Sequence, residues 1–482
     1  MRILFLLSSI VGSIIAEKNV IISILANDGF LLPAKVLDQG EYLQKWTFLF
    51  FFSFNVKLTS TYYYVRTYVV PYTLVVIAYR MKMLNMSVPY ILMVTENVSE
   101  RSIGELQSHK ITVQRTSLIT AAPAKKGIKY QYTRLRLWSM TEYDAIMYLD
   151  LDVLPLKDLK PFFKCGSFCA IFRHSDKFNS GVFVLRPNLT VYEDLLAKAP
   201  LLPTYDGGDQ GFLNSYFDQL KFTPMFDHTH PSEQKYKSEQ RTLSAALNYD
   251  IGMYYLNGGR FLVDPIIVHY TMGPTKPWIW WTYPLFDLNL YWSNTRKEME
   301  IFYGDTNPDM ELIIFVVLVG VCALFFRKLI LMGTEDYFRV DALTSSEDRT
   351  AHFVIVWISF LLSVNLVPLT AHPFASWIYF ITNLNILIVC LSDIFVRIRL
   401  GNYTTNYTYP RILASTLISL LILTALSLLA LTPTFGTRAT LAVVSMISLF
   451  FIIPLICKKV LIGCSDYHSR YQLLSLKKEY TH

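Results

Sequence analysis

The sequence predicts an α/β sandwich with a mainly parallel sheet, followed by an all-α bundle of about five transmembrane helices. Continuous apolar runs at 19–25 (NVIISIL), 89–95 (PYILMVT) and 145–149 (AIMYL) are typical of strands buried on both faces. Helix-like stretches at 99–108 and 131–142 alternate with these strands, as they do in α/β folds. From residue 311 onward the chain becomes a succession of long apolar runs, which predicts the second part.

The N-terminus, MRILFLLSSIVGSIIA (1–16), has the pattern of a secretory signal peptide. Arg2 supplies a positive start, an apolar run follows, and Ala16 precedes polar residues, while the run is short for a membrane span. An uncleaved signal anchor is the alternative. The α/β domain then covers 17–300, and an atypical insertion at 41–79 interrupts its strand–helix alternation.

The C-terminal region, 301–482, is predicted to be a transmembrane region with a cytosolic tail. Its apolar runs lie at about 311–326, 353–370, 374–396, 412–432 and 439–457. Each approaches the ~20 residues that a helix needs to cross a bilayer. Basic residues gather in the loops 327–352 and 397–411 and in the tail, which the positive-inside rule places in the cytosol. We therefore expect a multi-pass protein of the Golgi or ER membrane with a luminal α/β domain.

Composition limits the partners that we expect. The formal net charge of +7 is spread along the chain without a dense basic block, so nucleic acid is not an expected partner. A partner that carries phosphate, or an anionic membrane surface, suits the mild positive excess. Cys165 and Cys169 form a CxxxC pair, which predicts a disulfide in an oxidising lumen, with free thiols or half of a zinc site as alternatives.

Two aspartates end the third predicted strand in YLDLDVLPL (148–156). Asp150 and Asp152 lie where open α/β sheets bind ligands, at the carboxyl end of a parallel strand. Both carboxylates can reach one hard cation, which prefers oxygen ligands and often bridges phosphates. A solvated strand end is the alternative for such a pair taken alone.

Three polar motifs follow in order downstream. NSGVFVL (179–185) offers small residues that let a sugar or diphosphate approach the backbone. DGGDQGFLN (206–214) has polar side chains suited to hydroxyl recognition, and HYTMGPTKPW (269–278) has a histidine for a metal and a lysine for a phosphate. Taken singly, these features have structural alternatives: DGGDQG is a helix cap, His269 a core histidine and Lys276 a surface lysine.

In this order, and with the leading stretch TRLRLWSMTEYDAIMYLDLD, these motifs resemble glycosyltransferase family 8, the glycogenin-like enzymes. The resemblance covers roughly residues 19–285 apart from the insertion. FFKCGSFCAIFRHSDKFNSGV, SEQRTLSAALNYDIGMYYL and KPWIWWTYPLF are most similar to the membrane-bound plant-type inositol phosphorylceramide glucuronosyltransferases. The resemblance implies a Rossmann-like GT-A domain that binds a UDP-sugar donor together with Mn²⁺ or Mg²⁺.

The resemblance also implies roles for individual residues. Those expected to bind the metal are Asp150, Asp152 and His269. Those expected around the donor are Ile24, Asn27 and Phe30 near the nucleoside, Gly273 and Lys276 at the diphosphate, and Asn179, Ser180, Asp206, Asp209 and Gln210 around the sugar. Arg134 stands where glycogenin has a lysine, Leu151 replaces the small residue inside DxD, and Phe30 replaces a tyrosine.

The expected catalytic residues are Arg134, Asp209 and Gln210. Arg134 would stabilise charge on the departing diphosphate. Asp209 would form a transient covalent adduct if the acceptor does not attack directly on the same face, and both routes stay open.

The sequence therefore predicts a retaining, metal-dependent transferase that moves glucuronic acid, or a hexose such as glucose, from a UDP-sugar to a membrane lipid. An inositol phosphorylceramide-type sphingolipid is the expected acceptor. The alternatives are a glycogenin-like glucosyltransferase that acts on protein or glucan, and a non-catalytic multi-span membrane protein.

Overall fold

The computed structural model describes residues 17–26, 74–119, 129–173, 175–229, 238–271, 276–282, 286–304, 345–367 and 373–400, together with residues 440 and 444. The chain divides into two units, residues 1–274 and 275–482. The predicted signal peptide (1–16) and most of the predicted insertion (41–73) lie outside the described residues, so both stay predictions.

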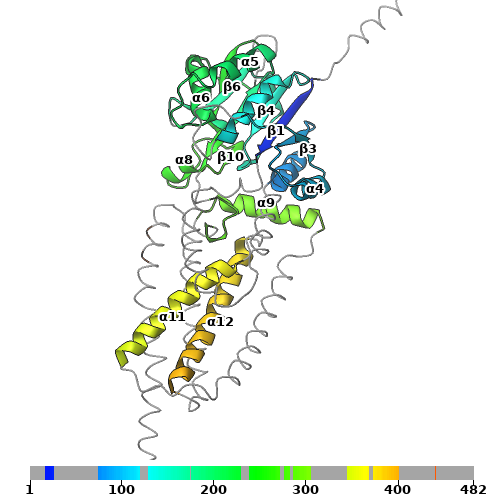
Figure 1. Cartoon of the computed structure of the whole chain (residues 1–482). Coiled ribbons are helices and arrows are strands. Elements are labelled where there is room, and N and C mark those ends of the chain that lie inside the picture. Colours follow the sequence, from blue (N-terminus) through cyan, green and yellow to red (C-terminus); the bar gives the residue numbers. More distant parts are fainter. Residues whose placement is uncertain are drawn as a thin grey trace, which may run out of the picture. The chain divides into compact units, whose positions relative to one another are not determined.

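A seven-stranded sheet forms the centre of the first unit, in the order β3-β2-β1-β4-β7-β6-β8. Its strands are β1 (Asn19–Leu25), β2 (Tyr90–Val94), β3 (Thr112–Arg115), β4 (Ala145–Leu149), β6 (Phe168–Phe172), β7 (Phe178–Leu185) and β8 (Gln240–Leu243). Figure 1 labels β1, β3, β4 and β6 of this sheet. Most neighbours are parallel, but β7 runs antiparallel to both β4 and β6. Strands β1, β2 and β4 agree with the three that the apolar runs predict.

A second, three-stranded sheet has the order β5-β10-β9. It contains β5 (Val153–Pro155), β10 (Ile267–His269) and β9 (Tyr249–Asp250). In β10, His269 pairs antiparallel with Val153 and parallel with Asp250. The small sheet therefore joins the segment that follows Asp152 to the strand that ends at His269.

Short helices connect the strands of the first unit. They are α4 (Glu100–Ser108), α5 (Leu189–Lys198), α6 (Asp209–Tyr216) and α8 (Ile251–Leu256), with 3₁₀ helices η1 (Lys129–Ser139), η2 (Lys160–Lys164), η3 (Asp218–Phe222) and η4 (Ala245–Asn248). Residues 74–83 are also helical, so the described end of the predicted insertion, 74–79, opens a helix. Ile77 of this helix packs in the core.

Both faces of the large sheet are covered, which explains why its central strands are apolar throughout. In β1, Ile22 belongs to one core cluster and Ile21 to the other, and in β4 Tyr148 and Met147 divide in the same way. This alternation follows from the two-residue period of a strand. It also places Tyr148 two residues before Asp150, on the same side of the chain.

Cys165 and Cys169 are joined by a disulfide between η2 and β6. Both residues are fully buried. Of the alternatives that the CxxxC spacing leaves open, the structure therefore has the disulfide.

The second unit contains η6 (Trp280–Thr282), α9 (Asn289–Phe302), α11 (Ser345–Leu366) and α12 (Pro373–Leu400). Helices α11 and α12 pack against each other, with the rings of Phe360 and Phe380 5.5 Å apart. Trp280 joins this cluster, its ring lying 4.9 Å from that of Trp377.

The predicted all-α bundle of about five transmembrane helices is contradicted. Among the helices that the structure describes, none combines the length and the apolar character that a bilayer span requires. Two predicted spans fall on α11 and α12, where polar residues interrupt the apolar runs, including Asn365 in α11 and Asn383 and Asn385 in α12. The runs at 311–326 and 412–432, and nearly all of 439–457, lie outside the described residues.

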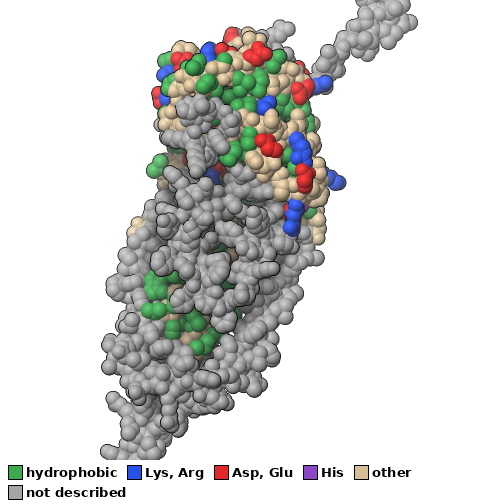
Figure 2. All heavy atoms as spheres, viewed as in Figure 1, with side chains coloured by type: hydrophobic (Ala, Val, Ile, Leu, Met, Phe, Trp, Pro, Cys, Tyr) green, Lys and Arg blue, Asp and Glu red, His purple; other side chains and the backbone are tan. Residues whose placement is uncertain are grey.

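The visible face of the first unit carries basic and acidic side chains side by side (Figure 2). In the first unit, an exposed ion pair joins Arg115 of β3 to Glu100 of α4, at 2.5 Å. The mixture agrees with the even spread of charge along the sequence.

Candidate active site

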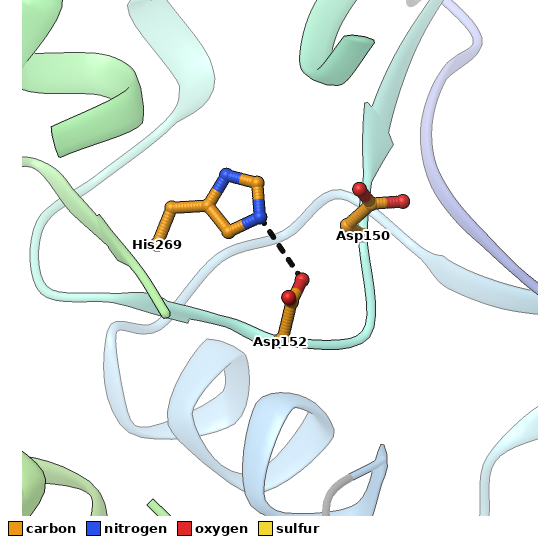
Figure 3. A group of neighbouring side chains, drawn as sticks. All are labelled: Asp150, Asp152 and His269. Carbon is orange, nitrogen blue, oxygen red and sulfur yellow. Dashed lines mark hydrogen bonds and ion pairs between the residues drawn. The ribbon is translucent and has the colours of Figure 1, made fainter. Parts of the chain in front are cut away.

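Asp150, Asp152 and His269 come together at the carboxyl end of β4 (Figure 3). Asp150 directly follows β4, Asp152 lies in the turn before β5, and His269 ends β10. One ligand atom from each lies within 4.8 Å of the others. The sheet β5-β10-β9 makes this possible, because 117 residues separate Asp152 from His269.

A chain of amide groups fixes the orientation of the His269 ring. The backbone N–H of Gly181 donates to Asn179 Oδ1 (3.0 Å), which identifies that atom as the amide oxygen. Asn248 Nδ2 donates to the same oxygen (2.9 Å), so Asn248 Oδ1 is the atom that faces His269 Nδ1, at 2.8 Å. His269 therefore carries a proton on Nδ1 and donates it to Asn248.

The other ring nitrogen of His269, Nε2, is then available to bind a cation. His269 Nε2 lies 3.0 Å from Asp152 Oδ1. If Nε2 is unprotonated, two lone pairs face each other at this distance, an arrangement that a bound cation or an added proton would relieve. Carboxylates and imidazole are ligand types that Mn²⁺ and similar divalent ions accept.

Gly181 leaves the space for this group. A Cβ atom at this position would lie 2.3 Å from His269 Cε1 and 2.7 Å from Asp150 Oδ2. Any larger residue would therefore push apart the side chains that converge here. The donor set and the space at Gly181 together fit a divalent metal, so the structure brings the three predicted metal ligands together.

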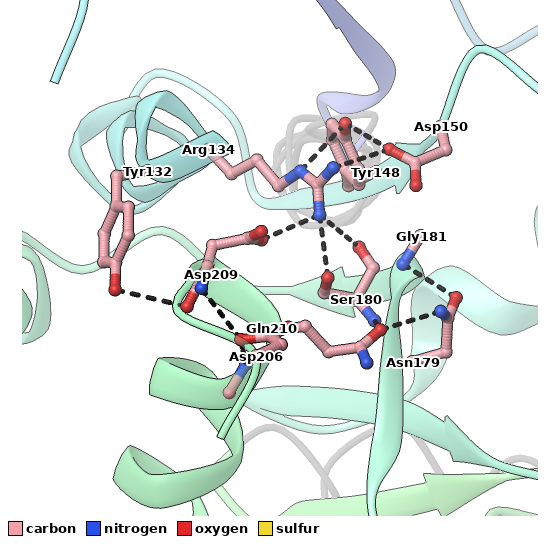
Figure 4. A network of polar contacts seen from close by, with 12 residues as sticks. Tyr132, Arg134, Tyr148, Asp150, Asn179, Ser180, Gly181, Asp206, Asp209 and Gln210 are labelled. Atoms are coloured by element: carbon pink, nitrogen blue, oxygen red, sulfur yellow. Dashed lines mark hydrogen bonds and ion pairs between the residues drawn. The ribbon is translucent and has the colours of Figure 1, made fainter. Parts of the chain in front are cut away.

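The candidate metal ligands Asp150, Asp152 and His269 are called the metal group. Arg134, from η1, connects this group to α6 (Figure 4). Its Nη2 donates to Asp150 Oδ1 (2.8 Å), and its Nη1 donates to Asp209 Oδ2 (2.7 Å) and to Ser180 Oγ (2.8 Å). Its Nε donates to the Tyr148 hydroxyl (3.0 Å), which in turn donates to Asp150 Oδ1 (2.7 Å). One guanidinium thus bridges two carboxylates from different elements.

Burial sets the charges in this network. Burial lowers the pKa of Arg134, but Asp150 and Asp209 outweigh it and raise that pKa overall, so the guanidinium stays charged. Burial raises the pKa of Asp209 to about 6, although Arg134 opposes the rise. Burial also raises the pKa of Tyr148 well above its usual range, which keeps its hydroxyl protonated as a donor to Asp150.

Gln210 and Asn179 form the adjoining amide surface (Figure 4). Gln210 Oε1 accepts from Asn179 Nδ2 (2.8 Å) and from the backbone N–H of Ser180 (3.2 Å). Gln210 Nε2 donates to the hydroxyl of Tyr205 (2.7 Å). These groups lie beside Asp209 and suit the recognition of sugar hydroxyls.

Asp206 shapes the turn that begins α6. Its Oδ1 accepts from the backbone N–H groups of Gly208 (2.8 Å) and Gly211 (3.1 Å), and from Thr204 Oγ1 (2.8 Å). The helix-cap alternative thus describes the observed contacts of this carboxylate, whereas Asp209 and Gln210 of the same motif belong to the polar network.

Three of the predicted site residues lie outside the described residues: Asn27, Phe30 and Gly273. Ile24 is buried in the core near the carboxyl end of β1, and Leu151 is buried in the turn between the two aspartates. Lys276 lies in the second unit, where its Nζ is 6.0 Å from the ring centroid of Trp278.

Sequence reasoning missed Asn248 and Tyr148 as site residues. The two-residue period of β4 is a local signal for Tyr148, since it places this side chain on the same side as Asp150. Asn248 has no comparable local signal, because its role depends on β9 pairing with β10. Gly181, which the sequence predicts to let a substrate approach the backbone, also makes room for His269 and Asp150 in the structure.

Parts of this sequence are similar to known proteins. The inositol phosphorylceramide glucuronosyltransferase 1 of Arabidopsis thaliana is 34% identical over 247 residues, which are 48% of this chain and 46% of that protein. Glycogenin-1 of Caenorhabditis elegans is 34% identical over 152 residues, which are 30% of this chain and 32% of that protein. These matches span less than half the length of either relative.

Among solved structures, the galactosyltransferase LgtC in complex with donor and acceptor sugar analogs is 13% identical. The match covers 58% of this chain and 95% of that chain, with a TM-score of 0.34. No protein-family model matches the chain. The sequence matches confirm the predicted resemblance to the glycogenin-like glycosyltransferases, and they support the prediction that this chain is a glycosyltransferase.

Proposed function

We propose that this protein transfers a sugar from a UDP-sugar donor in a reaction that requires a divalent metal and retains the anomeric configuration. The observation that carries this proposal is the convergence of Asp150, Asp152 and His269 beside the buried Arg134–Asp209 pair. A site that must bind a diphosphate needs positive charge and oxygen ligands for a metal, and a site that must bind a sugar needs polar groups nearby. All three are present within one network.

The metal ligands would be Asp150, Asp152 and His269, and we propose Mn²⁺ or Mg²⁺ as the ion. When bound, such an ion supplies a Lewis acid that offsets the negative charge on the departing diphosphate. Asn248 would hold His269 with Nε2 available to the ion, since it accepts the Nδ1 proton.

The polar side chains beside the metal ligands would bind and orient the sugar. Gln210 and Asn179 offer amide groups for its hydroxyls, and Arg134 fixes the carboxylate of Asp209 at 2.7 Å. This fixed carboxylate is the one we assign to the retaining step. Because Arg134 is buried and stays charged, it also contributes preorganised positive charge to the site.

The acceptor that we propose is a lipid with an inositol-phosphate headgroup, and the sugar is glucuronic acid or glucose. The similarity to an inositol phosphorylceramide glucuronosyltransferase supports the lipid acceptor and, of the two sugars, glucuronic acid. We place the reaction at a membrane surface of the Golgi or ER lumen. The Cys165–Cys169 disulfide supports an oxidising compartment, because such bonds are rare where thiols are kept reduced.

The test is UDP release by the purified full-length chain, with UDP-glucuronic acid or UDP-glucose and an inositol-phosphate lipid in mixed micelles. We expect release that depends on Mn²⁺ and a product of retained configuration by NMR. The double variant Asp150→Asn, Asp152→Asn should lose at least 100-fold in kcat/KM, since both carboxylate ligands lose their charge.

A matched double variant, Asp176→Asn, Asp264→Asn, controls for the loss of two negative charges. These side chains are 68% and 81% exposed and lie in surface ion pairs, which contribute little to stability. The control should keep wild-type activity. Metal-stimulated release that survives in the Asp150, Asp152 variant would refute the proposed metal site, and no release with any UDP-sugar would refute the proposed activity.

A further inference from the structure

Arg173 is a second arginine at the edge of the candidate active site, outside the Arg134 network. It directly follows β6, whose last residue, Phe172, pairs with Phe178 of β7. The next residue of β7 is Asn179, which belongs to the amide surface. The sheet register therefore places Arg173 at the same edge of the sheet as the residues proposed to bind the sugar.

Asp250 ties Arg173 to the strand beside the metal group. Arg173 Nη1 donates to Asp250 Oδ2, and the same oxygen accepts from Thr271 Oγ1 at 2.9 Å. The other oxygen of Asp250 accepts from the backbone N–H of Gly252 at 2.5 Å. Asp250 also pairs in register with His269, so the Arg173 side chain is anchored one strand away from a proposed metal ligand.

The guanidinium of Arg173 is engaged at one end only. Arginine has five N–H donors arranged to bind a carboxylate or phosphate through two parallel hydrogen bonds. Within the part of the chain that the structure describes, the contact from Nη1 to Asp250 is the single hydrogen-bonded contact of Arg173. Its side chain is only 10% exposed, so water satisfies little of the remaining donor capacity.

The charge of Arg173 is also incompletely balanced. Burial lowers the pKa of Arg173 although Asp250, Asp152 and Tyr205 act in the opposite direction. Desolvation therefore outweighs the attraction of its partner, and a further anion nearby would stabilise the guanidinium.

We propose that Arg173 is a substrate-binding residue that takes an anionic oxygen, from a carboxylate or a phosphate, on the donors that Asp250 leaves unused. This inference rests on the proposed function, which supplies two groups of this chemistry. One is the carboxylate of a glucuronic acid donor, and the other is the phosphate of an inositol-phosphate acceptor. A neutral sugar or headgroup would leave the guanidinium in its present, half-engaged state.

Binding calorimetry on the full-length chain with Mn²⁺ tests this with two matched pairs of ligands. UDP-glucuronic acid against UDP-glucose isolates the donor carboxylate, and inositol phosphate against inositol isolates the acceptor phosphate. We expect wild-type protein to bind the charged member of at least one pair more tightly. Arg173→Gln should weaken that ligand about 10- to 100-fold while changing its neutral counterpart less than about threefold. The pair that responds identifies the source of the anion.

Lys177→Gln is the matched control. It also removes a positive charge, four residues along the chain from Arg173, but the Lys177 side chain is 43% exposed. It should leave all four affinities unchanged, and the Tm of both variants shows whether the fold is intact. Arg173→Lys, which keeps the charge but not the planar fork, should recover only part of the preference.

The proposal is overturned if wild-type protein prefers the charged member of neither pair. It is also overturned if Arg173→Gln weakens charged and neutral ligands alike, which is the result for an arginine that only balances Asp250. The proposed function fails on a different reading, the absence of metal-dependent UDP release by wild-type protein, so the two failures are distinguishable.

Discussion

Replacing Asp209 with asparagine should change how the stability of the protein depends on pH. The Asp209 side chain is 1% exposed, and burial raises its pKa from 3.8 to about 6. The folded state therefore binds the proton more tightly than the unfolded state. The stabilisation from this proton is fully present below pH 3.8 and is lost as the pH rises through about 6.

The size of the effect follows from the shift. A rise of about two pKa units corresponds to about 3 kcal/mol, at about 1.4 kcal/mol per unit. Asparagine does not titrate, so Asp209→Asn lacks this loss. About 0.5 kcal/mol of this is already lost at pH 4, so between pH 4 and pH 7 the free energy of unfolding of the variant should gain about 2.4 kcal/mol relative to wild type. Arg134 keeps its contact with Asp150 at 2.8 Å, which limits the cost of the substitution itself.

Pulse proteolysis in urea measures this on the full-length chain, at pH 4, 5, 6 and 7 and with EDTA present so that no metal biases the titration. Asp264→Asn is the control, since this carboxylate is 81% exposed and should shift stability little with pH. If the stabilities of wild type and Asp209→Asn run parallel across this range, Asp209 is ionised as readily in the folded chain as in the unfolded one. The reasoning from burial would then be refuted.

Two further predictions concern the metal group. Gly181→Ala should weaken Mn²⁺ binding by at least 10-fold, because the added Cβ would lie 2.3 Å from His269 Cε1. The control, Gly104→Ala on α4, has nothing within 4 Å of the added Cβ, so it should leave Mn²⁺ binding unchanged and stabilise the helix by about 1 kcal/mol. Manganese titration and thermal unfolding of both variants check this, and a Gly181→Ala variant that binds Mn²⁺ as tightly as wild type would count against the steric argument. Asn248→Leu removes the acceptor for His269 Nδ1 and should lower Mn²⁺ affinity about 10- to 100-fold, measured as the concentration that half-activates UDP release; an unchanged value would show that the ring needs no such partner.

Local sequence signals predicted the central strands and the position of the aspartates. The runs at β1, β2 and β4 are apolar at successive positions because both sheet faces are covered, and this pattern is visible without any knowledge of the fold. The same pattern predicted the position of Asp150 and Asp152, because they follow the apolar run of β4. The pattern was less reliable in the second unit, where apolar composition alone suggested membrane spans that the described helices do not support.

The sequence by itself determined which residue types were available to the site, and the tertiary structure decided which of them meet. His269 is one of nine histidines, and the pairing of β10 with β5 brings it to Asp152. Arg134 reaches Asp209, 75 residues away, because η1 packs against α6, where the ring of Tyr132 lies 5.7 Å from that of Phe212. Such contacts depend on strand order and register, which pair distant segments of the chain. No pattern within a short stretch of sequence encodes them, so the grouping of Asp150, Asp152 and His269 was predictable only through the resemblance to a known family, and the strand pairing explains it.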